Sequence, residues 1–458
     1  MSIQQNVSDI NNKVGLNIPN RMDRLPIFSF HRTALFTLAF IYFFEFADLN
    51  TFSFAAPALI SSWGLSVSTV AVITSSTFLG MFIGATVGGW FADRLGRKKA
   101  LIISGTFFSL FSILNALAWD PISLGVFRCL TGVGLSALTV VANTYISEVF
   151  PSSVRGRYQG LCVTVGLIGI PITSFISSQL VPLASWGWRL VFVWGAVGIL
   201  FLFFMPKFME SPRWLEKRGR FEEAETVMHS IEAQAEKAKG RLEKPEAPVQ
   251  QIRVKSSSFT ELFKRKHIKL TLILVLVWIF QTFGFYGFGS WVPTLLSKQG
   301  IDLSNTLIYS TLITVGAPLG AFTGSLFSDK LERKWIITIS SIVIALCGLL
   351  YGLTLVPFMI ILFGFLVNFI ERIFSSNLYA YSAEVFSTEA RASGSGLSYG
   401  VGRLFNTIGP LFIGAIYTGL GYISVFIFIA LCWLAVTLII GLFGARTSKQ
   451  HLETIHMS

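Results

Sequence analysis

Hydrophobic runs separated by short polar loops fill most of this chain of 458 residues. Each run is long enough, at about 20 mostly apolar residues, for an α-helix to cross the hydrocarbon core of a bilayer. We expect helices because the backbone of a helix satisfies its own hydrogen bonds in lipid. The twelve expected spans lie at about 33–57, 69–92, 100–118, 122–146, 157–182, 188–206, 269–295, 306–328, 335–353, 356–381, 392–417 and 421–444.

A polar stretch at residues 207–268, rich in Lys, Arg and Glu, interrupts this pattern. It separates an expected six-helix bundle at 31–206 from a second one at 269–444. Within the stretch, Glu210 to Gln234 predicts a short amphipathic helix and Glu243 to Ser258 a linker. We expect two cytoplasmic tails, at 1–30 and 445–458, and the first has no signal-peptide core and is expected to be disordered.

Two segments of the chain read almost alike, 236 positions apart. A repeat this long predicts one structural unit written twice. The same step carries Gly84, Gly88, Asp93, Tyr145, Glu148 and Arg155 onto Gly320, Gly324, Asp329, Tyr381, Glu384 and Arg391.

Composition supports a polytopic helical membrane protein. The chain is 53% hydrophobic and 13% charged, with a mean hydropathy of +0.65, whereas soluble domains have about 25% charged residues. The four cysteines lie in apolar runs and read as small buried hydrophobes. Neither they nor the five histidines show metal-ligand spacing, and no phosphate-binding loop is present. We expect no metal, no cofactor and no enzymatic or ATP-driven chemistry.

The net charge of +12 could indicate nucleic acid binding, but the basic residues sit in short loops on one side of the expected membrane. This asymmetry is typical of cytoplasmic loops. We therefore expect both termini inside a prokaryotic cell (inner) membrane, with lipid and not nucleic acid as the large partner.

The repeated glycines, spaced four apart, lie on one helix face and allow a neighbouring helix to approach closely. The acid that follows them meets a basic loop at the membrane edge. Two explanations remain: ordinary helix packing, or a latch that holds one conformation of a moving pair. The candidate latch residues are Gly84, Gly88, Asp93, Arg94, Arg97, Glu148, Arg155, Asp329, Arg333, Glu384 and Arg391.

The segment Gly89-x3-Asp93-Arg94-x-Gly96-Arg97-Lys-Lys resembles the signature of the major facilitator superfamily of secondary transporters. The resemblance covers about residues 33–444. It implies an all-α polytopic membrane protein with 12 transmembrane helices in two six-helix bundles. These would rock around a site near the bilayer midplane. The second copy departs at Glu332, where the family has glycine. Further resemblances begin at Arg128, Glu148 and Glu210.

Two carboxylates, Glu45 and Asp48, lie in the first expected span, three positions apart and on one helix face. Two such groups in a poorly solvated cavity do not both ionise easily, so one of them is a candidate proton carrier. The segment resembles the Asp-Gly-x-Asp motif of aromatic-acid/proton symporters. We prefer Asp48 because it lies deeper; the alternative is a paired acid without a transport role.

Arginines in the spans are candidate anion sites, because a guanidinium keeps its proton. Arg128 is expected to face Asp48, and either binds a substrate carboxylate, releases Asp48 on protonation, or only holds the first bundle together. The segment from Gly402 resembles the Gly-Arg-x4-Gly-Pro pattern of organic-anion porters, longer by one residue. Glu371 would pair with one arginine and leave the other for substrate, unless Glu371, Arg372 and Arg403 form a closed network.

Aromatic and amide side chains complete the expected pocket. A planar ligand could stack on aromatic rings of the seventh span and bond to amides there and in the tenth. The candidates are Gln281, Phe285, Tyr286, Asn368, Asn377 and Tyr381.

These features favour a proton-coupled symporter, a monomer, for a small organic anion such as an aromatic or heteroaromatic carboxylate. A sugar or polyol symporter, a drug exporter and a non-transporting receptor on the same fold remain alternatives. Glu210-Ser-Pro-Arg213-Trp-Leu suggests the sugar reading, but few amides and hydroxyls line the expected pocket.

Overall fold

The computed structural model describes residues 17–245, 262–264, 268–327, 331–386 and 390–447, and within these ranges it contains helices and no strands. For residues 325–327, 391 and 392 it describes the backbone alone. The linker expected at 243–258 lies almost entirely outside the described residues, as does Asp329.

The N-terminal half follows the expected order of spans, with one change of helix type. Its sixth span begins as an α-helix and continues from Val197 as a 3-10 helix, η2. The elements are α3 (Ser29–Trp63), α4 (Val67–Leu95), α5 (Arg97–Ala116), α6 (Pro121–Val149), α7 (Arg155–Leu180), η1 (Val181–Leu183), α8 (Trp188–Ala196) and η2 (Val197–Lys207).

In the C-terminal half, two expected spans are interrupted. The seventh ends at Gly289 and is followed by a separate short helix, α12, and the eighth breaks at Val315. The elements are α11 (Ile268–Gly289), α12 (Val292–Lys298), α13 (Leu303–Thr314), α14 (Gly316–Phe327), α15 (Arg333–Leu353), α16 (Pro357–Glu384), α17 (Arg391–Leu420) and α18 (Tyr422–Phe443).

Eleven spans of the described chain are long and apolar enough to cross a membrane. The remaining expected span, the eleventh at 392–417, corresponds to α17, which has 30 residues but is not among the eleven. Its interior carries Arg403 and Asn406 and several glycines, which lower its hydropathy. This helix lines a cavity at the interface between the halves.

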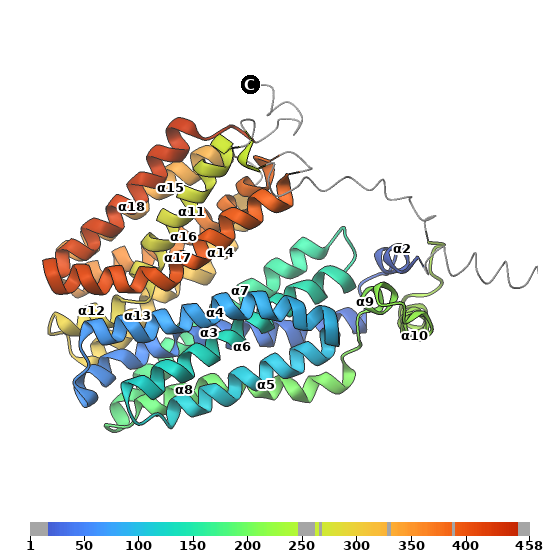
Figure 1. Cartoon of the computed structure of the whole chain (residues 1–458), viewed down its shortest axis with the longest axis horizontal. Helices are drawn as coiled ribbons and strands as arrows, with labels where there is room; N and C mark the ends of the chain where they lie inside the picture. The colour runs from blue at the N-terminus through green and yellow to red at the C-terminus, as the bar shows by residue number, and fades with distance from the viewer. Residues whose placement is uncertain (1–16, 246–261, 265–267, 328–330, 387–389, 448–458) are drawn as a thin grey trace, which may run out of the picture.

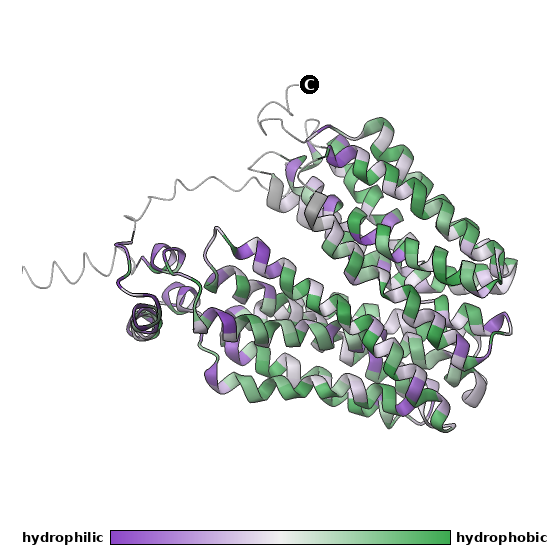
Figure 2. Ribbon diagram, turned by 180° about the vertical axis from the view of Figure 1, so that it is seen from behind, coloured by the Kyte–Doolittle hydropathy of each residue, from purple (hydrophilic) through white to green (hydrophobic). Residues whose placement is uncertain are grey.

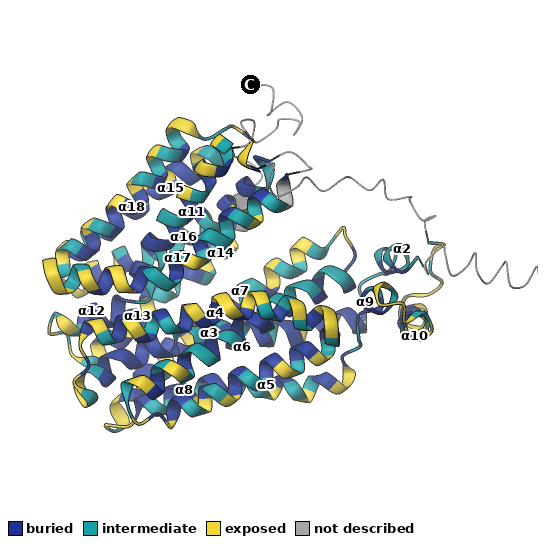
Figure 3. Cartoon of the chain, viewed as in Figure 1, coloured by how far each residue is buried: buried dark blue, intermediate teal, exposed yellow. Residues whose placement is uncertain are grey.

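The two halves meet at one end and diverge at the other (Figure 1). We call the end that carries α12 and α13 the α12 end. The opposite end, the loop end, carries α2 (Ile18–Asp23), α9 (Pro212–Lys217) and α10 (Phe221–Lys239). Hydrophilic colour is prominent on these three helices in Figure 2. Exposed positions cover the outer faces of both bundles (Figure 3), where the apolar side chains would face lipid.

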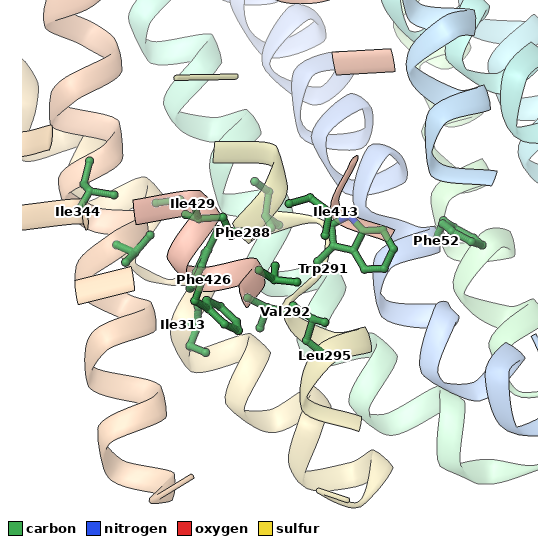
Figure 4. Close-up of a cluster of buried hydrophobic side chains, with 14 of the residues drawn as sticks. Phe52, Phe288, Trp291, Val292, Leu295, Ile313, Ile344, Ile413, Phe426 and Ile429 are labelled. Carbon is green, nitrogen blue, oxygen red and sulfur yellow. The ribbon is translucent and has the colours of Figure 1, made fainter. Parts of the chain in front are cut away.

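An apolar cluster closes the α12 end, and it includes residues from both halves (Figure 4). Phe52 of α3 lies in the same cluster as Phe288, Trp291 and Ile413 of the C-terminal half. Hydrogen bonds add to this contact. The Ser53 hydroxyl donates to the Ser290 carbonyl at 2.8 Å, and the Thr311 hydroxyl lies 3.0 Å from Oγ of Ser174.

The repeated glycines pack helices against one another in each half. A Cβ added at Gly84 of α4 would lie 2.1 Å from the backbone oxygen of Val133 on α6. At the equivalent Gly320 it would lie 2.0 Å from the oxygen of Phe369 on α16. Both positions therefore require glycine for the observed approach of the helices.

Gly84→Ala should force α4 and α6 apart and lower the stability by about 1–3 kcal/mol, the usual cost of overpacking. We expect a lower unfolding temperature in detergent. Gly89→Ala on the same helix is the matched control, because a Cβ there meets nothing within 4 Å. Equal unfolding temperatures for the two variants would contradict this account of the packing.

The N-terminal segment departs from the expected disordered tail. Residues Ile18–Asp23 form helix α2, with Ile18 and Met22 fully buried. Arg21 forms ion pairs of 2.7 Å with both Glu225 and Glu232 of α10. The expectation of disorder is wrong for this part because these contacts, distant in sequence, order it. The helix expected over 210–234 is likewise divided into α9 and α10, with Gly219 between them at φ 73.

The pKa of Glu232 should make the docking of α2 sensitive to acid. Burial raises this pKa, but hydrogen bonds from Arg21 and Arg24 outweigh burial, and the net shift is downward. Because the pKa of Glu232 is lower in the docked state, its ionised form stabilises docking at pH values above the ordinary glutamate pKa. This stabilisation is lost as the pH falls through the pKa of the docked state. Glu232→Gln should remove it at neutral pH. Hydrogen exchange of residues 18–24 should then accelerate, and Glu236→Gln, with an exposed side chain, should leave it unchanged.

Candidate functional site

A central cavity of about 90 Å³ lies between the two halves. Its walls come from α3, α4, α6 and α7 on one side and from α11 and α16 on the other. Two side cavities, of about 60 and 40 Å³, share Phe285 and Arg372 with it. A larger loop-side cavity of about 340 Å³ lies toward the loop end, between α3, α4 and α6 and the C-terminal helix α17.

Aromatic rings form a slot in the central cavity. The rings of Phe78 and Tyr286, from opposite halves, are 4.9 Å apart at 75°. Phe285 lies 4.8 Å from Tyr286, and the Arg372 guanidinium carbon lies 4.7 Å from the Phe285 ring. The slot therefore offers flat apolar surfaces beside a cation.

Asp48 and Arg128 form an ion pair inside the N-terminal half, with Nη1 and Oδ2 3.5 Å apart. Asp48 is fully buried, its Oδ1 lies 2.5 Å from the Ser112 hydroxyl, and a Cβ at Gly195 would meet that oxygen. Asp48 lines none of the four described cavities. Although it lies deeper than Glu45, neighbouring helices enclose it.

The Arg128 guanidinium is bonded within its own half. Nε donates to Oγ1 of Thr77 at 3.2 Å, and Nη1 donates to Oγ1 of Thr51 and to the Asp48 carbonyl, both at 3.3 Å. It forms part of the central cavity wall. These hydrogen bonds nevertheless favour the interpretation that Arg128 holds the N-terminal bundle together over the one in which it binds a substrate anion.

Glu371 and Arg372 form the corresponding pair in the C-terminal half, with Nε and Oε2 3.3 Å apart. Ser375 donates to Oε1 of Glu371 at 2.5 Å and Gln281 lies 3.5 Å from the same oxygen. Glu371 thus takes one arginine. The closed network with Arg403 is absent from the ion pairs of the described residues.

Arg403 is held by aromatic side chains instead of a carboxylate. Its Nε donates to the Tyr399 hydroxyl at 2.6 Å, and its guanidinium carbon lies 5.0 Å from the Tyr399 ring. Trp278 and Tyr379 pack on Tyr399 at 5.1 and 5.6 Å. Tyrosine is neutral at pH 7, so within the described chain no ion pair neutralises Arg403.

Glu45 lines the loop-side cavity. Its side chain is buried to 5% exposure, and its Oε2 lacks a hydrogen-bond partner among the described residues. Of the two carboxylates on α3, the one nearer to the loop end is therefore the one at a cavity.

Three candidate pocket residues of α16 have different positions. Asn368 lines a side cavity and donates to the Gly364 carbonyl at 3.1 Å. Asn377 is fully buried, with a hydrogen bond to the Ile373 carbonyl, and lines none of the described cavities. The Tyr381 hydroxyl donates to the Ala445 carbonyl at the loop end, 3.0 Å away.

The Tyr381 contact is a structural repeat. Tyr145 makes the same bond, to the Met209 carbonyl at 2.9 Å, and both partners are 236 positions apart. Neither Tyr381 nor Asn377 lines one of the four described cavities. Sequence reasoning missed Tyr399, although its position four residues before Arg403 puts both on one helix face. It also missed Asn406, Trp278 and Tyr379, which line the side cavity next to Arg403.

Three latch residues of the first half, Asp93, Arg97 and Glu148, form one cluster at the loop end. Arg97 binds Glu148 at 2.6 Å and Asp93 at 3.0 Å. Glu210 caps the start of α5 by accepting from the backbone N–H of Arg97 at 2.8 Å. A Cβ at Gly96 would lie 2.3 Å from a Glu210 oxygen, so this capping needs glycine. Burial raises the pKa of Glu210, and the hydrogen bonds from backbone N–H groups partly oppose this rise.

The second half repeats part of this cluster. Arg333 binds Glu384 at 2.9 Å, as Arg97 binds Glu148. Glu332, in place of the glycine, accepts from the Thr447 backbone N–H at 3.0 Å. Asp329 lies outside the described residues, and the side chain of Arg391 is not described.

Two latch candidates of the first half contact other groups. Arg94 lies over the Trp90 ring at 5.2 Å, and Arg155 lies 3.9 Å from Asp23 of the α2 segment. Neither forms an ion pair with the Arg97 cluster.

The family model for sugar (and other) transporters matches residues 32–458. The chain belongs to the major facilitator superfamily. It is similar over 95% of its length to YyaJ of Bacillus subtilis, a candidate metabolite transport protein, with 52% identity and 97% of that protein covered. It is also similar to two Acinetobacter baylyi proteins. The niacin transporter NiaP is 29% identical, covering 96% of this chain and 100% of NiaP, and the 4-hydroxybenzoate transporter PcaK is 30% identical, covering 83% of each.

The fold is similar to that of a solved transporter. The xylose transporter XylE from E. coli, in a partially occluded inward open conformation, matches with a TM-score of 0.75 and 18% identity, over 93% of this chain and 100% of XylE. This confirms the expected fold, a membrane transporter of two helical bundles. The homologues and structural neighbours are transporters and not enzymes.

We expect the Asp48–Arg128 ion pair to contribute to the free energy of unfolding of this transporter. Arg128→Gln leaves a buried carboxylate unpaired, and removing one partner of a buried pair costs about 3–5 kcal/mol. The unfolding temperature in detergent should fall, and the double variant Asp48→Asn/Arg128→Gln should recover part of the loss. A double variant less stable than either single variant would argue against the pairing.

Proposed function

We propose that this transporter is a proton-coupled symporter of a small aromatic or heteroaromatic carboxylate. The observation that carries the proposal is Arg403, a cation in the membrane interior without a carboxylate partner among the described residues, close to an aromatic slot. A buried arginine of this kind attracts an anion. The Phe78, Phe285 and Tyr286 rings suit a flat ligand.

The size of the cavity supports a ligand with a single ring. The central cavity of about 90 Å³ shares Phe285 and Arg372 with neighbouring cavities of about 60 and 40 Å³, and an apolar cavity of about 150 Å³ holds a benzene molecule. A sugar would need many hydroxyl and amide partners. About half of the described residues around the central cavity are apolar, and Asn50 is the one amide among them, so the sugar alternative is less favoured.

The relatives support the same substrate class. Niacin and 4-hydroxybenzoate, named for two of them, each combine one flat ring with one carboxylate. At about 30% identity these names suggest a class of ligand for this chain, and the aromatic slot with its arginines suits that class.

We further propose that the loop end faces the cytoplasm of a bacterium across its inner membrane, with both termini inside. The basic loops support this orientation. The halves would then be closed toward the outside by the α12 end cluster and parted toward the inside. The cavity lies between the two halves of one chain, which supports transport by a monomer.

The test is uptake into proteoliposomes with an imposed pH gradient. Niacin or 4-hydroxybenzoate should accumulate on the alkaline side, and a protonophore should abolish accumulation. A non-transporting receptor would be stabilised by these acids without flux. A drug exporter or sugar symporter would ignore them in favour of cations or sugars, and any of these results would contradict the proposal.

Tyr286→Leu should weaken substrate binding, because an aromatic pair contributes about 0.5–1.5 kcal/mol beyond its buried area. This corresponds to a KM raised about 2- to 12-fold. Phe283→Leu is the matched control. Phe283 lies on the same helix but packs on Phe405, Phe412 and Phe428, away from the cavities. A similar KM for both variants would argue against the slot.

A further inference from the structure

In each half of the described chain, one ionisable side chain in the middle of the membrane has no ion-pair partner within that half. Among the described residues, three carboxylates and three arginines lie within the spans away from the helix ends. One pair is internal to each half: Asp48 with Arg128 at 3.5 Å, and Glu371 with Arg372 at 3.3 Å. Glu45 remains in the N-terminal half and Arg403 in the C-terminal half.

The two remaining charges line the same loop-side cavity from opposite sides. Tyr399 orients Arg403 through a hydrogen bond of 2.6 Å, while Oε2 of Glu45 has no hydrogen-bond partner in the described chain.

Other groups near Glu45 do not supply a competing charge. Tyr42, one turn before it on α3, donates to Oδ1 of Asn143 at 2.5 Å. Besides Glu45 and Arg403, Tyr399 of α17 is the one titratable residue of the described chain that lines this cavity. Thr139 of α6, beside Glu45, does not titrate.

We propose that Glu45 and the substrate carboxylate compete for Arg403, and that this competition couples proton to substrate. In the empty carrier, ionised Glu45 and Arg403 neutralise each other across the cavity. When Glu45 takes a proton from solvent, Arg403 is free to bind the carboxylate. Release of the substrate returns Arg403 to Glu45, which gives its proton back to solvent on the side where the cavity is open. The idea rests on the proposed function and assigns its coupling site.

The charge balance then sets the stoichiometry. Empty with ionised Glu45, or loaded with protonated Glu45, the cavity carries no net charge. Substrate without a proton leaves one negative charge, and a proton without substrate leaves one positive charge. Because an unbalanced charge in the membrane interior is unfavourable, the halves would close only in the two neutral states. One proton should cross with each monocarboxylate, and transport should be electroneutral.

This assignment moves the coupling from Asp48 to Glu45. Asp48 already has its arginine and is enclosed by Ser112 and Gly195, with no surface on a described cavity. A substrate carboxylate has no described route to it. Glu45 has both a cavity and an unpaired cation facing it.

The test measures proton uptake on binding. Niacin or 4-hydroxybenzoate is added to purified protein in weakly buffered detergent solution near pH 7.5. The wild type should take up about one proton per substrate, and its affinity should fall about tenfold per pH unit once Glu45 is ionised in the free protein. Glu45→Gln should bind both acids with no proton uptake and with an affinity that changes less than about twofold between pH 6.5 and 8.5. Glu236→Gln, on the surface of α10, should behave as wild type.

The outcomes separate the two proposals. If the wild type binds neither acid, the proposed function fails and this inference with it. If the wild type binds and takes up a proton but Glu45→Gln does so too, or if Asp48→Asn alone abolishes the uptake, the inference is overturned and the proposed function stands.

Arg403→Gln provides a second test. Its affinity for the carboxylate should fall more than tenfold, while its circular dichroism spectrum should show that it remains folded. Uptake driven by membrane potential alone would also overturn the inference.

Discussion

The cost of an unpaired charge in the membrane interior is the constraint on which the site depends. Insertion scales put it at about 2.5–3.5 kcal/mol for a residue at the middle of a helix. Each half reduces this cost with one internal ion pair. One charged residue of the membrane interior then remains unpaired in each half of the described chain, Glu45 in the first and Arg403 in the second. Within the described residues, Glu45 and Arg403 have no ion-pair partner in their own halves, and both line the loop-side cavity between the halves.

The repeat describes the scaffold, and the site lies where the repeat fails. The contact of Arg97 with Glu148 recurs as Arg333 with Glu384, and Tyr145 and Tyr381 bind backbone carbonyls 236 positions apart. By contrast, the same step takes Asp48 to Gly284 and Arg128 to Gly364. At these two glycines the C-terminal half has Trp433 and Ile313 in contact distance. Duplication thus kept the helix packing and the loop-end contacts, while the charges are specific to each half.

The two ends of the interface are built from different interactions. Apolar side chains and three hydrogen bonds join the halves at the α12 end. At the loop end the ion pair of Arg97 with Glu148 lies within the N-terminal half, and that of Arg21 with Glu232 joins the N-terminal segment to α10. Neither pair includes a residue of the C-terminal half, so both can persist when the halves separate at this end.

The sequence by itself determined the number and order of the membrane spans, the duplication, the superfamily and the set of residues that carry charge in the membrane. These follow from hydropathy, spacing and motif, which are local properties of the chain. Only the tertiary structure decided which charges meet. Helix periodicity puts Glu45 and Asp48 on one face, but the packing of α5 and α8 encloses Asp48 and leaves Glu45 at a cavity. Glu371 could have bound either arginine, and Tyr381 could have faced the pocket. Distances between helices far apart in sequence settled both, and no local pattern encodes those distances.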